Sequence, residues 1–319
     1  MSRALLLACL VIVSSPLTAY NKTHEGEEIL EQARLTSDIR ELPSFTMKAA
    51  IKIEVQGKTL TGEYAFLWNG PNQWREETSL PGFDEIRVGG AGTVALKRNL
   101  DFVPLRISQL RYVLGYARGG LALRSGEEIK RVQNRKVSGI AARCVEIAGK
   151  LYPREICVDA STGAMVRDVP FADKEFAPIG TRIFPRFLSY TQEGKTVAQA
   201  EITELNATDP LPPSAFAVHA GAVSQPSCLS PAIGQLMKRV NPAYPDSARR
   251  AHVQGTVYIY AVIGSDGSLH NLRIVSGVSP DLNEASLAAV QRWRYEPSTC
   301  QNTPVELESV IQVNFKLSY

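Results

Sequence analysis

The chain has 319 residues, of which 44% are hydrophobic and 21% are charged, a composition typical of a folded protein and not of a disordered one. Its length predicts two domains. The 35 basic and 32 acidic residues give a formal net charge of +3. The basic residues are scattered, so the sequence does not indicate a nucleic-acid partner.

The first 19 residues have the pattern of an export signal peptide. Arg3 gives a charged start, residues 4–13 form an apolar run, and the residues up to Ala19 resemble a cleavage site. The apolar run is shorter than the ~20 residues needed to cross a bilayer. We therefore expect export and cleavage after Ala19. The alternatives are an uncleaved signal that anchors the chain in the membrane, and lipidation at Cys9.

Cleavage at that point leaves four cysteines, Cys144, Cys157, Cys228 and Cys300. An even number of cysteines in an exported chain favours two disulfides. Of the three connectivities we favour Cys144–Cys157 across one hairpin and Cys228–Cys300 near the C-terminus. There is no C-x-x-C pair and the four histidines are isolated in sequence, so we expect neither a metal site nor a bound cofactor.

Residues 22–206 are expected to form a β-rich domain. A helix is predicted at 25–39, followed by a strand at 45–55 in which apolar and polar residues alternate strictly. Such alternation indicates an antiparallel sheet with one buried and one wet face. A second helix is predicted at 103–114. Further strands are expected at residues 60–68, 129–137, 142–148, 155–159, 164–168, 184–191 and 195–205, and one beginning at Trp74.

This order of a leading helix, meandering strands and an inserted helix resembles the LolA-like half-barrel of periplasmic lipoprotein carriers. The resemblance implies a concave apolar face that can hold an acyl chain. Its lining would be Phe45, Met47, Ile51, Tyr64, Phe66, Trp68 and Trp74. The alternative is that these side chains simply form the core of the domain.

Residues 207–227 have little periodicity and contain four prolines, so we interpret them as a semi-rigid connection between the domains. Residues 228–319 then predict a short helix around Ala248, strands at 256–263 and 269–275, and a helix capped by Ser279. One side of that helix carries Leu282, Ala285, Ala289 and Trp293. A last strand is predicted at 305–317.

A right-handed return of the helix over the hairpin places the last strand beside the first, so the sheet order becomes 2-1-3. The chain is thus expected to be an α+β protein. It would combine an N-terminal antiparallel half-barrel-like sheet with helices and a small C-terminal β-β-α-β domain with a three-stranded antiparallel sheet. In that order the last strand is an edge, with one row of backbone N–H and C=O groups unpaired.

A set of motif residues characterises the C-terminal part. They are Tyr244, Pro245, Gly255, Asp266, Gly267, Trp293, Arg294, Tyr295 and Pro297. Together with the strand around Val313, this spacing resembles the TonB C-terminal domain over about residues 235–319. The resemblance implies a periplasmic module that pairs with a short segment of an outer-membrane receptor and transmits inner-membrane energy to it. The motif residues themselves are expected to pack the core and shape turns.

The edge strand can accept an extended peptide. The residues expected to form this surface are Leu307, Ser309, Ile311, Gln312, Val313, Asn314, Phe315 and Leu317. The expected partner is an outer-membrane TonB-dependent receptor or another envelope protein. The same edge could also pair with a second copy of the chain to form a homodimer.

The alternative function is a periplasmic lipid or lipoprotein carrier that uses the TonB-like module for docking. The sequence contains no G-x-S-x-G elbow, no H-E-x-x-H motif and no phosphate-binding glycine loop. The acidic residues are spread over positions that we interpret as wet strand faces, so no catalytic carboxylate pair can be named. We therefore expect a protein that is not an enzyme.

Overall fold

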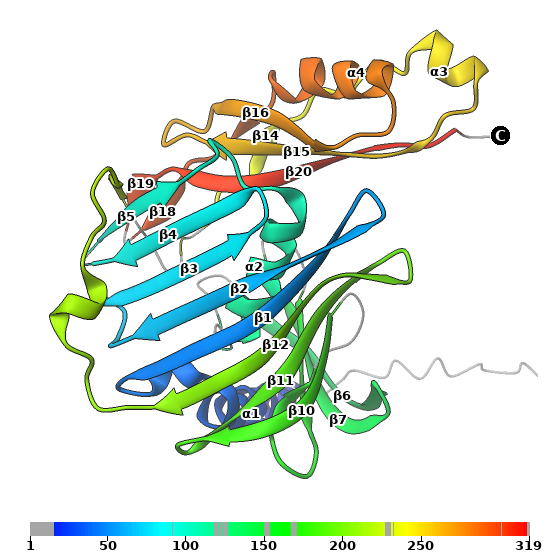
Figure 1. The fold of residues 1–319 in the computed structure, drawn as a ribbon. Coiled ribbons are helices and arrows are strands. Elements are labelled where there is room, and N and C mark those ends of the chain that lie inside the picture. Colours follow the sequence, from blue (N-terminus) through cyan, green and yellow to red (C-terminus); the bar gives the residue numbers. More distant parts are fainter. Residues whose placement is uncertain are drawn as a thin grey trace, which may run out of the picture.

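The computed structural model (Figure 1) describes residues 16–90, 92–117, 121, 123, 127–149, 154–166, 171–226, 231, 233–300 and 302–317. Most of the predicted signal peptide, with Cys9, lies outside the described residues, as does Cys228. The chain forms mostly antiparallel sheets with few helices. This is the α+β class that the sequence predicts.

The first helix, α1 (Pro16–Ser37), begins nine residues before the predicted start and is followed by the 3-10 helix η1 (Ile39–Glu41). The prediction differed because residues 16–19 were assigned to the end of the signal peptide, and residues 20–24 were assigned to no element. Asp38 ends α1 and caps η1, because its Oδ1 accepts a hydrogen bond from the Arg40 amide.

A nine-stranded antiparallel sheet forms the N-terminal half-barrel. Its strands are β1 (Phe45–Val55), β2 (Lys58–Trp68), β3 (Trp74–Leu80), β4 (Phe83–Gly89), β5 (Thr93–Arg98), β10 (Phe171–Ile179), β11 (Arg182–Gln192), β12 (Lys195–Ala207) and β13 (Val223–Pro226). They lie in the order β10-β11-β12-β1-β2-β3-β4-β5-β13. The segment predicted to connect the domains thus contributes β13, which pairs with β5, and the short helix η2 (Pro213–Phe216).

Helix α2 (Leu105–Ala117) lies on the concave side of this sheet (Figure 1). Ile107, Leu110 and Leu114 of α2 are buried against the inward side chains of the sheet. All seven residues predicted to line an acyl-chain site belong to this core and are at most 4% exposed. In this structure the concave face is therefore filled by α2 and by its own side chains.

A smaller sheet covers α1. It contains β6 (Glu128–Val137), β7 (Ile140–Ala148), β8 (Arg154–Asp159) and β9 (Met165–Val166), paired in that order. Ile29, Leu30 and Ala33 of α1 pack against β7 and β8. The last two residues of the strand predicted at 164–168 lie outside the described residues.

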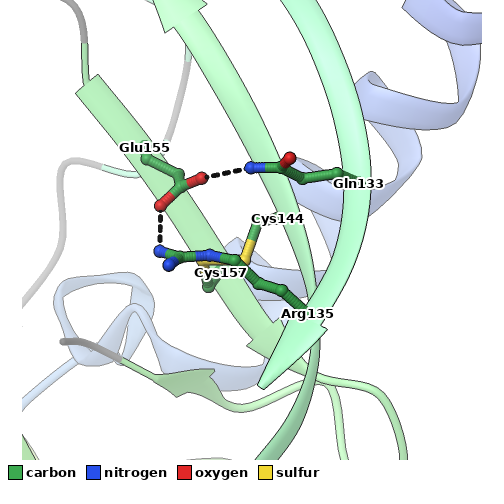
Figure 2. The surroundings of a disulfide bond; sticks show 5 residues. All are labelled: Gln133, Arg135, Cys144, Glu155 and Cys157. Carbon is green, nitrogen blue, oxygen red and sulfur yellow. Dashed lines mark hydrogen bonds and ion pairs between the residues drawn. A yellow bond between two sulfur atoms is a disulfide. The ribbon is translucent and has the colours of Figure 1, made fainter. Parts of the chain in front are cut away.

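Cys144 of β7 and Cys157 of β8 face each other across this sheet and form a disulfide (Figure 2). Above it, the Arg135 guanidinium forms an ion pair with Glu155, which also accepts a hydrogen bond from Gln133 at 3.0 Å. Both sulfurs are covered, since the two cysteines are at most 5% exposed. The second predicted pairing, Cys228–Cys300, stays a prediction.

Replacing both Cys144 and Cys157 by serine is expected to lower the free energy of unfolding by about 2–4 kcal/mol, because the unfolded chain regains the freedom of a short loop. Urea denaturation of the oxidised wild type and of the double variant measures this difference. Replacing Gln133 by serine, which leaves the bridge intact, serves as the control. Equal midpoints for the wild type and the double variant would contradict the prediction.

The C-terminal module repeats the predicted order. Its elements are β14 (Leu236–Lys238), α3 (Asp246–Arg250), β15 (Gly255–Ile263), β16 (Leu269–Ser276), α4 (Pro280–Val290), β17 (Arg294–Tyr295), β18 (Ser298–Cys300), β19 (Thr303–Val305) and β20 (Leu307–Phe315). The sheet order β16-β15-β20 is the predicted 2-1-3. The predicted last strand is interrupted at Glu306, because residues up to Val305 form a small hairpin with β18.

Candidate partner-binding edge

Strand β20 pairs with β15 over nine consecutive residues, from Leu307 opposite Ile263 to Phe315 opposite Gly255, without a register shift. Among the described residues no other strand pairs with it. Its second edge therefore presents backbone N–H and C=O groups that β15 does not use. This is the geometry that accepts an added strand.

The other sheet edges of the described chain are irregular, short or charged. β16 pairs with β15 through two register shifts, and β10 contains Pro178 and a positive φ at Glu175. β13 has four residues and ends in Pro226, and β9 has two residues. β6 carries four basic side chains. Bulges, prolines and charges are the usual means of protecting an edge, so β20 is the edge best suited to pairing.

The side chains of β20 alternate between two surroundings. Ile311, Val313 and Phe315 are buried beneath α4 in the core of the module. Gln312 and Asn314 are exposed on the opposite face. Of the residues predicted to contact a partner, those that point into the core can offer only their backbone. Leu317 lies beyond the strand, where its amide donates to Gln254 Oε1 at 2.8 Å.

Several motif residues pack or shape turns around the core of the module. The Tyr244 ring packs edge-on against Phe315, and its hydroxyl donates to the Val253 carbonyl at 2.6 Å. Trp293 Nε1 donates to the Val240 carbonyl at 2.8 Å. Gly267 has a φ of +77°, and a Cβ there would lie 1.8 Å from the Tyr295 carbonyl oxygen. Only glycine fits that close approach.

Five further motif residues shape the backbone near these contacts. Pro245 is the N-cap of α3. Asp266 Oδ1 accepts the Ser268 amide at 2.8 Å, and Arg294 Nη1 donates to the Trp293 carbonyl at 2.7 Å. Pro297 directly precedes β18, and Gly255 begins β15 with a φ of +149°. Together they fix the turns and chain entries around the sheet.

The sheet face opposite α4 lies against the half-barrel, which the sequence did not predict. Tyr260 of β15 is 1% exposed, belongs to the half-barrel core cluster and contacts the Phe102 ring edge-on. Tyr258 accepts a hydrogen bond from Gln192 at 3.0 Å, and Arg273 forms an ion pair with Asp101 at 2.7 Å. The module therefore has one face under α4 and the other on the half-barrel.

Beneath this contact lies an ion-pair cluster inside the half-barrel. Its members are Glu76, Glu85, Arg87, Arg98 and Arg111. Glu85 is almost fully buried, with Arg98 Nη1 at 3.1 Å from its Oε2 and Arg111 in direct contact. The interpretation of the acidic strand residues as uniformly solvent-facing was thus wrong, because Glu76 and Glu85 point into the concave side.

Glu308 of β20 connects the module to this cluster. Its Oε1 accepts hydrogen bonds from Arg98 Nη2 at 2.9 Å and from the Tyr260 hydroxyl at 2.7 Å. Burial alone would raise the pKa of the Glu308 carboxyl, but the hydrogen bond and charge of Arg98 hold that pKa below its usual value. Burial, followed by the nearby Glu308 charge, raises the pKa of Tyr260.

A Glu308→Gln variant is expected to be less stable than the wild type at neutral pH but equally stable in acid. The lowered pKa means that the carboxylate stabilises the folded chain above the unfolded value of about 4.3, and that this contribution is lost as pH falls through the lower folded value. Thermal unfolding of both proteins at stepwise lower pH measures the difference. A gap between the two midpoints that persists unchanged in acid would contradict this assignment.

Comparison with known proteins identifies the class of the C-terminal module. Residues 240–317 match the family model for the Gram-negative bacterial TonB protein C-terminal, so this part of the chain is similar to TonB C-terminal domains. Protein TonB of Klebsiella pneumoniae is 32% identical over 76 residues, covering 24% of this chain and 31% of that protein. Protein TonB of Vibrio cholerae is 28% identical over 108 residues, covering 33% of this chain and 43% of that protein. The chain thus spans less than half the length of these relatives.

The N-terminal region is similar to solved structures of low sequence identity. A LolA superfamily protein from Nitrosomonas europaea aligns with a TM-score of 0.41 at 14% identity, covering 61% of this chain and 97% of that one. A putative outer membrane lipoprotein-sorting protein domain from Vibrio parahaemolyticus aligns with a TM-score of 0.41 at 12% identity, covering 61% of this chain and 97% of that one. In the described part of the chain, no helix combines the length and the apolar character needed to cross a bilayer.

Proposed function

We propose that this chain is a non-catalytic protein of the periplasm that binds an envelope partner by strand addition at β20. The observation that carries the proposal is the nine-residue regular pairing of β20 on one side only, within the described chain. Main-chain hydrogen bonds supply most of the affinity in this mode of recognition. A strand of this length can form enough of them for a specific contact.

The resemblance to TonB proteins supports an outer-membrane receptor segment as the partner. Gln312 and Asn314 expose polar side chains beside the free edge, and an added strand would place alternate side chains next to them. A polar, extended segment is therefore the best fit. The core side chains of β20 fix the strand to the module and leave its backbone as the recognition element.

The test uses the full chain and extended N-terminal segments of outer-membrane receptors from the same organism. We expect at least one segment to bind and to protect amides of Leu307–Phe315 from hydrogen exchange. A matched segment with proline at alternate positions lacks the required N–H groups and should not bind. Equal binding of the proline segment, or protection confined to other strands, would exclude strand addition at β20.

Self-association is a separate outcome of the same experiment. If the free chain is dimeric by light scattering and the β20 amides are already protected, the edge pairs two copies of this chain. A receptor segment would then have to compete with the second copy. A monomer with unprotected edge amides is the expected result.

A further inference from the structure

The sheet of the C-terminal module lies over the half-barrel, and β20 is one of its two edge strands (Figure 1). Glu308, the second residue of β20, reaches Arg98 at the end of β5, with 2.9 Å between the two side chains. Further along the strand, Gln312 and Asn314 are exposed. Among the described residues of β20, Glu308 therefore provides the contact with Arg98 of the half-barrel, near the beginning of the strand.

Arg98 is held in a fixed orientation before it meets Glu308. It is almost fully buried, its Nη1 contacts Glu85 and its Nε donates to the Leu100 carbonyl at 2.9 Å. Nη2 is the group directed to Glu308. The Tyr260 hydroxyl donates to the same carboxylate oxygen. A planar guanidinium with its donors fixed in this way gives a directional, charge-assisted contact.

Charge balance gives Glu308 a second role. The ion-pair cluster of the half-barrel contains two carboxylates, Glu76 and Glu85, and three guanidinium groups, Arg87, Arg98 and Arg111. One positive charge is in excess. The carboxylate of Glu308 comes from the other domain and neutralises it. Leaving a buried charge uncompensated is unfavourable, so the cluster favours the arrangement in which β20 is close to β5.

We propose that Glu308 is an autoinhibitory latch that holds the beginning of β20 against the half-barrel and lowers the affinity of the edge for its extended partner. The inference rests on the proposed function of β20. An added strand lies about 4.8 Å from its neighbour and projects side chains to both sides. Arg98 of β5 contacts Glu308 at the beginning of the edge, so we expect a full-length pairing to require the latch to open.

The latch predicts how partner affinity depends on domain closure. When only a fraction of molecules is open, the apparent affinity falls by that fraction. The contacts Arg273–Asp101 and Tyr258–Gln192 also hold the two domains together, but they involve β15 and β16 and not β20. Weakening either the latch or one of these contacts should make the edge more available.

The experiment compares the full-length wild type with Glu308→Gln, using the receptor segment that binds the wild type most tightly. We expect about tenfold tighter binding by the variant, which corresponds to about 1.4 kcal/mol. Glu306→Gln is the matched control, because Glu306 precedes β20 and pairs with the exposed His270 of the same module. Unchanged or weaker binding by Glu308→Gln would overturn the latch while leaving strand addition intact.

A second variant and a ligand-free readout keep the two proposals separable. Asp101→Asn weakens the ion pair with Arg273 without changing β20, so it should also tighten binding. Without any segment, hydrogen exchange of the 307–310 amides should be faster in Glu308→Gln than in Glu306→Gln. If no segment binds any of the proteins, the proposed function fails, and the exchange rates still decide the latch. Equal rates in both variants would overturn it.

Discussion

Replacing Trp293 by alanine is expected to unfold the C-terminal module, with a loss of about 3–5 kcal/mol in its free energy of unfolding. The indole is 4% exposed, packs in the core of the module and donates its Nε1 proton to the Val240 carbonyl at 2.8 Å. The substitution removes the packing and also leaves a carbonyl without its donor. Hydrogen exchange of β15 and β20 measures the loss directly.

A matched variant in the same module is Met237→Ala, because Met237 is 70% exposed. It should leave the exchange of β15 and β20 unchanged. Trp293→Phe is an intermediate case, since it keeps an aromatic ring but removes the donor to Val240. Protection in Trp293→Ala equal to that of the wild type would show that the indole does not support the sheet.

The C-terminal module was predictable because its signals are local. Ser279 accepts the Leu282 amide at the start of α4, as its position before Pro280 predicts. The turn at Asp266 and Gly267 joins β15 to β16 as expected. Such signals act within a few residues, and the handedness rule then leaves one strand order. The edge position of β20 follows from these two steps.

The ion-pair cluster was not predictable from the same patterns. On β3, Glu76 and Thr78 share the inward face with Trp74 and Leu80. Period-two alternation assigns charged positions to the wet face, and it has no means of distinguishing a buried charge that has a partner. The partners of Glu85 lie 13 and 26 residues away in the sequence, on β5 and α2. Only the folded half-barrel brings them together.

The contact between the domains depends on still longer separations. Arg98 and Glu308 are 210 residues apart in sequence. The sequence predicted that the helix returns over one face of the sheet, but it gave no sign that the other face packs on a second domain. Tyr260 was the available signal, since a large aromatic residue on the sheet face away from the helix is a candidate for an interface. Because the half-barrel contacts β20 at Glu308, we expect a partner to pair first with the end of the strand near Gln312 and Asn314.

Replacing Glu85 by glutamine is expected to lower the free energy of unfolding of the half-barrel by about 3–5 kcal/mol, because Arg98 and Arg111 then lose their shared buried counter-charge. The change preserves the shape of the side chain, so packing is maintained. Urea denaturation measures the loss. Glu77→Gln is the control on the neighbouring strand, because Glu77 is partly exposed and paired with Arg75. This substitution should lower the free energy of unfolding by at most ~1 kcal/mol.

The same Glu85→Gln variant also tests whether the ion-pair cluster affects the contact between the two domains. With Glu85 neutral, Glu308 becomes the main counter-charge of Arg98, so the domain contact should tighten while the half-barrel itself weakens. Exchange of the 307–310 amides should then slow relative to the Glu77→Gln control, as long as the measurement is made well below the unfolding midpoint. A half-barrel as stable as the wild type would mean that the buried pairs contribute no more than surface ion pairs, and the electrostatic basis of the domain contact would be wrong.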